Sequence, residues 1–305
     1  MRKMKSTTKC SKIEFSEIAN EEFKHLKSKN LDISRYLEFT DYFKEKADVI
    51  RHCNDFVQYS ITADGEVRVT NSFCRERLCP TCQRARSNKL YANARKIIDY
   101  FNGKYDYILI TLTAKNVKIG NLSDTITKLN TASRKLFGNE RIKRSIKGSW
   151  RTLEVTYNAE RNDYHPHIHA LCAVPKSYFN SRLYISQADY LALWRSLYSG
   201  SFDGGVNVQR VRDYGSGIAE VCKYSVKPFE FDENLPFSIR VKVIDELFTV
   251  LKGRRLLQLF GVFRSARAEL KLTEELENPP PSKSDKVYYY SFNHKLMMFE
   301  GVGLS

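Results

Sequence analysis

Three histidines, each separated by one residue, are the strongest sign of chemistry in this sequence. His165, His167 and His169 alternate with Pro166 and Ile168, and side chains two residues apart point to the same face of a β-strand. Neighbouring Cα atoms on that face lie roughly 6.7 Å apart, so two imidazoles can reach one ion. We predict His167 and His169 as metal ligands and His165 as a supporting residue or further ligand. A single histidine in a strand is a hydrogen-bonded core residue about as often as it is a metal ligand, but burial in the core explains three histidines on one face poorly.

A carboxylate for the same ion is expected from the preceding strand. Residues 150–157 alternate between polar and apolar side chains, with Glu154 on the polar face. If the connecting loop forms a hairpin with Asn158 opposite His165, Glu154 faces His169. Two imidazoles, one carboxylate and open positions for water and phosphate suit Mn²⁺ or Mg²⁺ acting as a Lewis acid on a phosphoryl oxygen.

A second group of reactive side chains lies on a predicted helix, residues 217–227, which stops at Pro228. Glu220 and Tyr224 are four residues apart and share one helical face, and Lys227 follows one turn later. A phenol ordinarily has a pKa of about 10, but a nearby cation and a metal-polarised phosphate make its attack feasible. Tyr224 is the predicted nucleophile, giving a 5′-phosphotyrosine and a free 3′-hydroxyl, with Glu220 as general base in a closing step. The alternative is that Glu220 and Lys223 form a solvated ion pair and that Tyr224 is a half-buried packing residue.

Four of the seven cysteines are spaced as ligands of a structural zinc ion: Cys53, Cys74, Cys79 and Cys82. Cys53 is the most distant in sequence, and His52 could replace it. A redox pair is the other interpretation of Cys79-x2-Cys82, but no thioredoxin-like strand and helix surround it and two further cysteines lie nearby. Because the first 16 residues lack the apolar run of a signal peptide, we expect free thiols in a cytoplasmic bacterial protein.

The charge balance indicates a polyanionic partner. The chain carries 50 Lys and Arg against 35 Asp and Glu, a formal net charge of +15, and nucleic acid is the partner that fits best. A membrane is not expected as a partner, since no run of 18 apolar residues could cross it. Basic residues gather around the cysteines, where a solvated basic face is the alternative to a DNA contact. The predicted DNA-binding residues are Arg75, Arg77, Arg84, Arg86, Lys89 and Lys223.

The order of predicted strands and helices favours an α+β fold, a mainly antiparallel central sheet with helices on one side, plus a small zinc-binding segment and a helical C-terminal region. Strands are expected at residues 105–113, 150–157, 166–174 and 206–212. The predicted segments are an N-terminal helical segment at 1–50, the zinc-binding basic segment and helix at 51–100, the catalytic core at 101–228, a helical region at 229–277, and a linker and tail at 278–305.

With these motifs in this order, the chain resembles the plasmid rolling-circle replication initiators (Rep proteins), a single-tyrosine branch of the HUH endonuclease superfamily. The resemblance runs from about Cys53 to Pro228 and rests on FCRERLCPTCQRARS, YILITLT, HPHIHAL and EVCKYSVK. It implies a ferredoxin-like HUH nuclease core, metal binding by His167 and His169, and a phosphotyrosine at Tyr224. Conjugative relaxases also carry a histidine cluster, but their tyrosine precedes the histidines.

The resemblance further implies site-specific nicking and joining of single-stranded or hairpin plasmid origin DNA, with Glu220 promoting release at termination. It also implies work alongside a host helicase and polymerase, and as more than one copy of the chain. Two other functions are compatible with parts of the pattern. A histidine-triad nucleotide hydrolase or transferase would use His167 as nucleophile without a metal, and a non-catalytic zinc-containing DNA-binding regulator would need only the basic surface.

Overall fold

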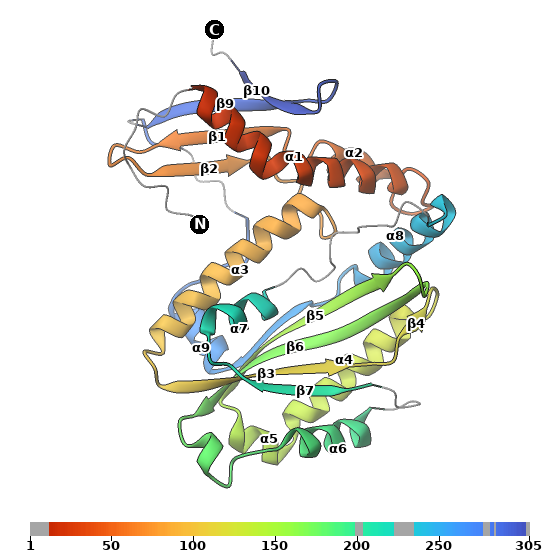
Figure 1. Ribbon diagram of the computed structural model, residues 1–305, viewed down its shortest axis with the longest axis vertical. Helices are drawn as coiled ribbons and strands as arrows, with labels where there is room; N and C mark the ends of the chain where they lie inside the picture. Colours follow the sequence, from red (N-terminus) through yellow and green to blue (C-terminus); the bar gives the residue numbers. More distant parts are fainter. Residues whose placement is uncertain (1–11, 199–203, 223–234, 277–280, 284, 303–305) are drawn as a thin grey trace. The chain divides into compact units, whose positions relative to one another are not determined.

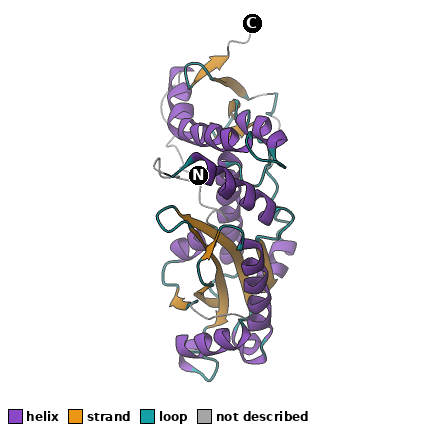
Figure 2. Cartoon of the chain, turned by 90° about the vertical axis from the view of Figure 1, so that its right-hand side faces the viewer, coloured by secondary structure: helices purple, strands orange, loops and turns teal. Residues whose placement is uncertain are grey.

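The computed structural model describes residues 12–198, 204–222, 235–276, 281–283 and 285–302 (Figure 1). The chain divides into two compact units, which are treated separately below. Unit 1 comprises residues 1–85 and 275–305, and unit 2 comprises residues 86–274. Both units contain helices and strands (Figure 2). The five segments predicted from the sequence divide the chain more finely and stay a prediction.

Unit 1 is built on a four-stranded antiparallel sheet of order β10-β9-β1-β2. Its strands are β1 (Phe56–Ile61), β2 (Val67–Asn71), β9 (Lys286–Asn293) and β10 (Met298–Val302), and its helices are α1 (Lys12–Leu37) and α2 (Lys44–Arg51). Aromatic side chains of α1 and the sheet, including Phe15, Tyr59, Tyr290 and Phe299, form its core. The sequence predicted only a tail at the C-terminal end, whereas alternation of buried aromatic residues makes β9 a strand of this sheet.

Unit 2 is built on a larger sheet of order β7-β3-β6-β5-β8, with the short β4 beside β6 (Figure 1). Its strands are β3 (Tyr105–Thr113), β4 (Val117–Lys118), β5 (Gly148–Asn158), β6 (Asp163–Pro175), β7 (Val206–Arg210) and β8 (Leu257–Gly261). All neighbouring pairs are antiparallel, which confirms the predicted α+β class.

Helices cover both faces of this sheet, so the prediction of helices on one side was wrong. One face packs against α7 (Tyr214–Val221), α9 (Val262–Glu269) and the last turns of α3 (Pro80–Tyr100). The other face packs against α4 (Leu122–Gly138), and α5 (Glu140–Ser145), α6 (Gln187–Leu197) and α8 (Phe237–Leu251) adjoin α4. The reason lies in β5 and β6, whose residues are buried almost without alternation, as expected for strands covered on both sides.

Local signals set several helix boundaries. Ser186 and Asp189 form the predicted capping box that begins α6. The helix predicted at 217–227 begins earlier, at Tyr214, because the Asp213 carboxylate accepts hydrogen bonds from two backbone amides of its first turn. The region predicted as helical at 229–277 also contains β8 between α8 and α9. Among the described residues, no helix is long and apolar enough to cross a membrane.

Candidate metal centres

The hairpin of β5 and β6 brings the predicted carboxylate to the predicted histidines. The register differs from the expectation by two residues: Glu154 lies opposite His167, and Thr152 lies opposite His169. The loop is tighter than predicted, because pairing continues to Asn158 opposite Asp163. A shift of two residues preserves the face of every side chain, so Glu154 still points toward the imidazoles.

Three ligand atoms converge at this place in the sheet. Glu154 Oε2 lies 3.2 Å from the Nε2 atoms of both His167 and His169. Glu154, His167 and His169 are 3%, 7% and 7% exposed, so the group is largely protected from solvent but still has some accessible surface. These side chains form one of the clusters in unit 2 that could hold a metal ion.

The other nitrogen of each imidazole is held by a neighbour. His167 Nδ1 lies 3.0 Å from the carbonyl oxygen of His165, so this nitrogen must donate, and Nε2 of the neutral ring keeps its lone pair for the cluster. His169 Nδ1 lies 3.1 Å from the Thr111 hydroxyl. The His165 ring itself faces Asn116 Oδ1, 2.7 Å from its Nδ1, and is not a member of the three-residue cluster.

Burial alone would raise the pKa of the Glu154 carboxyl. The neighbouring imidazoles of His167 and His169 outweigh burial and lower this pKa to about 2. Glu154 is therefore a carboxylate throughout the physiological range, which is the form that binds a cation.

Helix α7 places a second carboxylate beside the cluster. Glu220 Oε1 lies 3.4 Å from His169 Nε2, and its side chain is 27% exposed, against 4% for Glu154. The Thr152 hydroxyl, next to His169 across the sheet, donates to the Val221 carbonyl at 2.6 Å and so fixes the end of α7 against the sheet. The sequence indicated the helix and Glu220, but this anchor could not be read from it.

Three predicted residues, Tyr224, Lys227 and Lys223, lie outside the described residues. The nearest described position is Cys222, whose carbonyl oxygen accepts a hydrogen bond from the Ser87 hydroxyl on α3. The assignment of the nucleophile stays a prediction.

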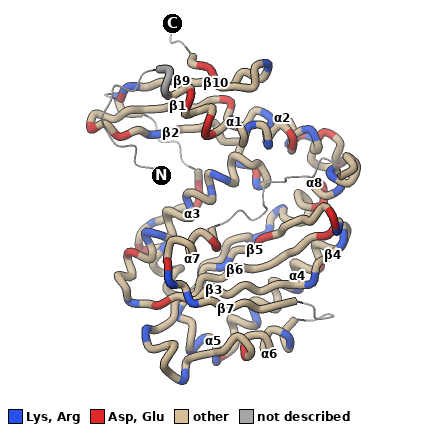
Figure 3. The backbone as a smooth tube through the Cα atoms, viewed as in Figure 1, with Lys and Arg blue, Asp and Glu red and all other residues tan. Residues whose placement is uncertain are grey.

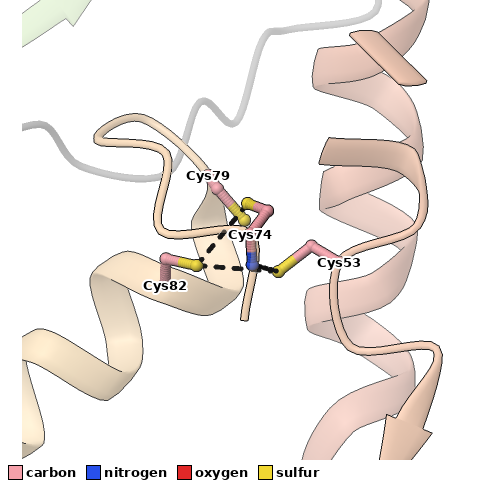
Figure 4. A group of neighbouring side chains, drawn as sticks. All are labelled: Cys53, Cys74, Cys79 and Cys82. Carbon is pink, nitrogen blue, oxygen red and sulfur yellow. Dashed lines mark hydrogen bonds between the residues drawn. The ribbon is translucent and has the colours of Figure 1, made fainter. Parts of the chain in front are cut away.

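The four predicted cysteines meet in unit 1 (Figure 4). Cys82 Sγ lies 3.6 Å from the Sγ atoms of both Cys53 and Cys74, and all four sulfurs, including that of Cys79, lie within 4.8 Å of one another. A zinc ion with Zn–S bonds of about 2.3 Å separates tetrahedral sulfurs by about 3.8 Å, so the group fits this ion. The described cysteines are all free thiols, as expected.

Backbone amides and α1 support this cysteine group. The Arg75 amide donates to Cys82 Sγ at 3.2 Å, and hydrogen bonds with the other cysteines hold the pKa of Cys82 far below its usual range. Asn30 on α1 donates to the Cys53 carbonyl at 3.2 Å and to the Thr81 hydroxyl at 2.9 Å. Sequence reasoning missed Asn30, because nothing local relates a helix residue to cysteines so far along the chain.

His52 does not take the place of Cys53. Its Nδ1 lies 2.7 Å from Asp55 Oδ2, and His294 Nε2 lies 3.1 Å from Asp55 Oδ1. These three side chains form another cluster of ligand type in unit 1, which the sequence did not suggest because His294 lies far along the chain, in the turn between β9 and β10. The buried Lys27 ammonium also contacts Asp55, so a cation already neutralises this carboxylate.

The predicted DNA-binding residues around the cysteines lie at the surface. Arg75 and Arg84 are exposed, whereas Arg77, Arg86 and Lys89 are half-buried. Lys and Arg recur along α3 (Figure 3). This distribution is compatible with a contact to a polyanion, and DNA binding by these side chains stays a prediction.

Comparison with known proteins gives a consistent result. Residues 66–290 match the model of the replication protein family. "Protein rep" of Streptococcus pneumoniae serotype 2 is 32% identical over 254 residues, which cover 78% of each chain. "Protein rep" of Bacillus sp is 30% identical over 254 residues, 76% of this chain and 82% of the relative. "Protein rep" of Staphylococcus aureus is 34% identical over 194 residues, 62% of this chain and 85% of the relative. No solved structure matches significantly.

The matched range spans most of the chain and includes the β5–β6 hairpin, α7 and three of the four clustered cysteines. Several relatives with the same name are similar over three quarters of their own length or more. This chain therefore belongs to the replication protein family and is a plasmid replication initiator.

Proposed function

We propose that this initiator starts rolling-circle replication by nicking and rejoining one strand of the plasmid origin as an HUH endonuclease. Tyr224 is the nucleophile, and Glu154, His167 and His169 hold a divalent cation, Mn²⁺ or Mg²⁺. A structural Zn²⁺ is held by Cys53, Cys74, Cys79 and Cys82.

One observation carries this proposal: three atoms that can each give a lone pair to a cation meet within hydrogen-bond distance. Because His167 Nδ1 donates to a carbonyl, its Nε2 lone pair faces Glu154 Oε2 at 3.2 Å, with His169 Nε2 equally close to the same oxygen. The lone pairs of His167 Nε2 and Glu154 Oε2 repel one another at this distance unless a cation or a shared proton lies between them. A bound divalent cation would relieve this repulsion and would supply Lewis-acid polarisation of a phosphoryl oxygen.

In this proposal, Tyr224 and Lys227 carry out the cleavage step. The Tyr224 phenol oxygen forms a bond to phosphorus while the bond from phosphorus to the 3′-oxygen breaks, giving a 5′-phosphotyrosine and a free 3′-hydroxyl. Lys227 lowers the cost of forming the phenolate. The Cys222 carbonyl accepts a hydrogen bond from Ser87 of α3, which fixes the chain just before the nucleophile. Tyr224 follows Cys222 by two residues, and two extended residues span at most about 7 Å.

The two carboxylates differ in exposure, which suits two roles. Glu154 is almost fully buried and serves as a ligand, whereas the more exposed Glu220 can reach a water molecule or a second hydroxyl. Glu220 acts as the general base in the closing step, when the phosphotyrosine is resolved.

The partner in this scheme is single-stranded or hairpin DNA of the plasmid origin, contacted through the basic residues of α3 and the segment before it. No observation on the described residues favours a histidine-triad hydrolase, because His167 Nε2 faces a carboxylate instead of an open substrate site. A purely regulatory DNA-binding protein would leave the convergence of Glu154 and the histidines unexplained.

The test is intact-mass spectrometry of the purified chain after incubation with Mn²⁺ and single-stranded oligonucleotides that tile the replicon encoding it. The wild type is expected to gain the mass of a 5′-linked DNA fragment, and Tyr224→Phe is expected to gain none. Tyr214→Phe, which changes an exposed tyrosine ten positions earlier in the sequence, is the matched control and should form the adduct normally. An adduct of undiminished yield on Tyr224→Phe would show that another residue is the nucleophile.

A further inference from the structure

A cavity of about 420 Å³ lies in unit 2 on the sheet face opposite to the histidines. Residues from the end of α4, helix α5, the first part of β5 and the end of β8 line it, and it is open to solvent on one side. Arg151 of β5 lines it, and its side chain lies on the other face from Glu154 because side chains alternate along a strand. The lining residues used below are Arg134, Phe137, Lys143, Lys147, Arg151 and Phe260.

One residue that lines the cavity is a buried arginine to which the described part of the chain offers no acidic partner. Arg151 is 5% exposed, and its guanidinium carbon lies 3.9 Å from the ring centre of Phe260 and 4.7 Å from that of Phe137. It donates to Ser133 Oγ at 3.2 Å and to Gln258 Oε1 at 3.3 Å, while its Nε atom has no hydrogen-bond partner among the residues that the structure describes. Burial lowers the pKa of Arg151 to about 10, so the group stays charged at neutral pH.

The described residues around Arg151 do not neutralise its charge. Among the described residues, no carboxylate forms an ion pair with Arg151, and no Asp or Glu lines the cavity. Arg134, Lys143 and Lys147 add three exposed cations at the rim, of which Lys143 also pairs with Glu140 at 2.9 Å. Because a buried unpaired charge is costly, an anion entering here would be stabilised.

The cavity also offers an aromatic surface. Phe260 is 42% exposed although Arg151 covers part of its ring, so ring surface remains for a second planar group. Cations together with exposed aromatic rings are the features with which proteins bind phosphate and stack a base of a nucleotide.

The wall beside Phe260 requires glycine at two facing positions. A Cβ on Gly261, which has φ +54°, would lie 2.1 Å from the Lys147 carbonyl oxygen, and a Cβ on Gly148 would lie 2.7 Å from the Phe260 carbonyl oxygen. The close approach of β5 and β8 therefore fixes where Phe260 and Lys147 stand.

We propose that this cavity binds one nucleotide unit, with the base against Phe260 and the phosphate between the rim cations and Arg151. Its volume is within the range of small-ligand sites, which begins at roughly 300 Å³. The nucleotide is either free or part of a single DNA strand, since both present a base and a phosphate. The site is separate from the proposed metal centre and does not depend on nicking.

The test is calorimetric titration of the full chain with thymidine 5′-monophosphate in buffer without added divalent metal. Lys147→Glu and Phe260→Ala are each expected to weaken binding by about tenfold, the equivalent of one lost contact of about 1.4 kcal/mol. Lys128→Glu, an exposed charge reversal on α4 outside the lining residues, is the matched control and should bind as the wild type does. Circular dichroism checks that each variant is folded.

Absence of binding to the wild type would overturn the proposal, as would equal binding by wild type and Lys147→Glu. Inorganic phosphate that binds as tightly as the nucleotide would also overturn it, because the base would then contribute nothing. A trithymidylate that binds more tightly than the mononucleotide would support the proposal and identify a strand as the source. Tighter binding of the mononucleotide would support it and identify a free nucleotide.

Discussion

The substitution Glu154→Gln tests the proposed metal centre most directly. Gln has the same shape as Glu, so packing in the buried hairpin is kept, but the only carboxylate of the three-residue cluster is lost. The amide can also donate a hydrogen bond to His167 Nε2, which relieves the repulsion that a cation relieves in the wild type. We expect a folded protein with much weaker affinity for Mn²⁺.

The size of the effect follows from linkage. Losing a residue that only supports a metal ligand lowers affinity about 10- to 100-fold, so loss of a direct carboxylate ligand should lower it by about 100-fold or more. At a Mn²⁺ concentration about 100 times the wild-type Kd, binding stabilises the wild type by about 2.7 kcal/mol. The same concentration is close to the Kd of the variant, so binding stabilises the variant by only about 0.4 kcal/mol. The difference corresponds to about 5–9 °C in Tm for a unit of the size of residues 86–274.

Two measurements check this prediction. Titration of free Mn²⁺ by electron paramagnetic resonance gives the ratio of Kd values, and calorimetric scans with and without Mn²⁺ give the shift in Tm. Glu160→Gln is the matched control, since Glu160 is an exposed carboxylate in the loop of the same hairpin. If Glu154→Gln bound Mn²⁺ as tightly as the wild type, Glu154 would not be a ligand and the argument from the convergence of these three side chains would be wrong.

Three further outcomes are expected. Cys82→Ser should lower the zinc content below one ion per chain, measured by plasma mass spectrometry, because Cys82 is the sulfur closest to two others; unchanged zinc would exclude it as a ligand. Thr152→Val should destabilise unit 2 by about 1–3 kcal/mol in urea, since the buried Val221 carbonyl loses its donor, and no change in midpoint would contradict this anchor. Gly217→Ala should cost about 1–3 kcal/mol, because the new Cβ would lie 2.7 Å from Val211 Cγ1; Gly120→Ala, with open space but φ +95°, separates crowding from backbone strain.

The predicted metal centre depends on a local property and on a tertiary one. Alternation along a strand is local, so the sequence was sufficient to place the histidines on one face and Glu154 on the matching face. The register depends on how the loop between the strands closes, and here the prediction was two residues off. The error left Glu154 on the predicted face of the sheet, because side chains along a strand alternate with a period of two residues.

Packing decided the rest of both centres. Glu220 reaches His169 because Thr152 holds the end of α7, and the cysteine group is completed by Asn30 from α1. These contacts join residues dozens of positions apart, so no spacing rule contains them. The same is true of the helices on both faces of the sheet, which followed from the burial of β5 and β6 on both sides.

The sequence by itself determined the α+β class, the candidate ligands and their order along the chain, because these depend on residue type and short-range periodicity. Only the tertiary structure decided which oxygen meets which nitrogen, which thiols are neighbours, and that Arg151 is buried between two aromatic rings without an acid. The physical reason is that distances between distant segments are set by the packing of whole side chains, which no single segment encodes.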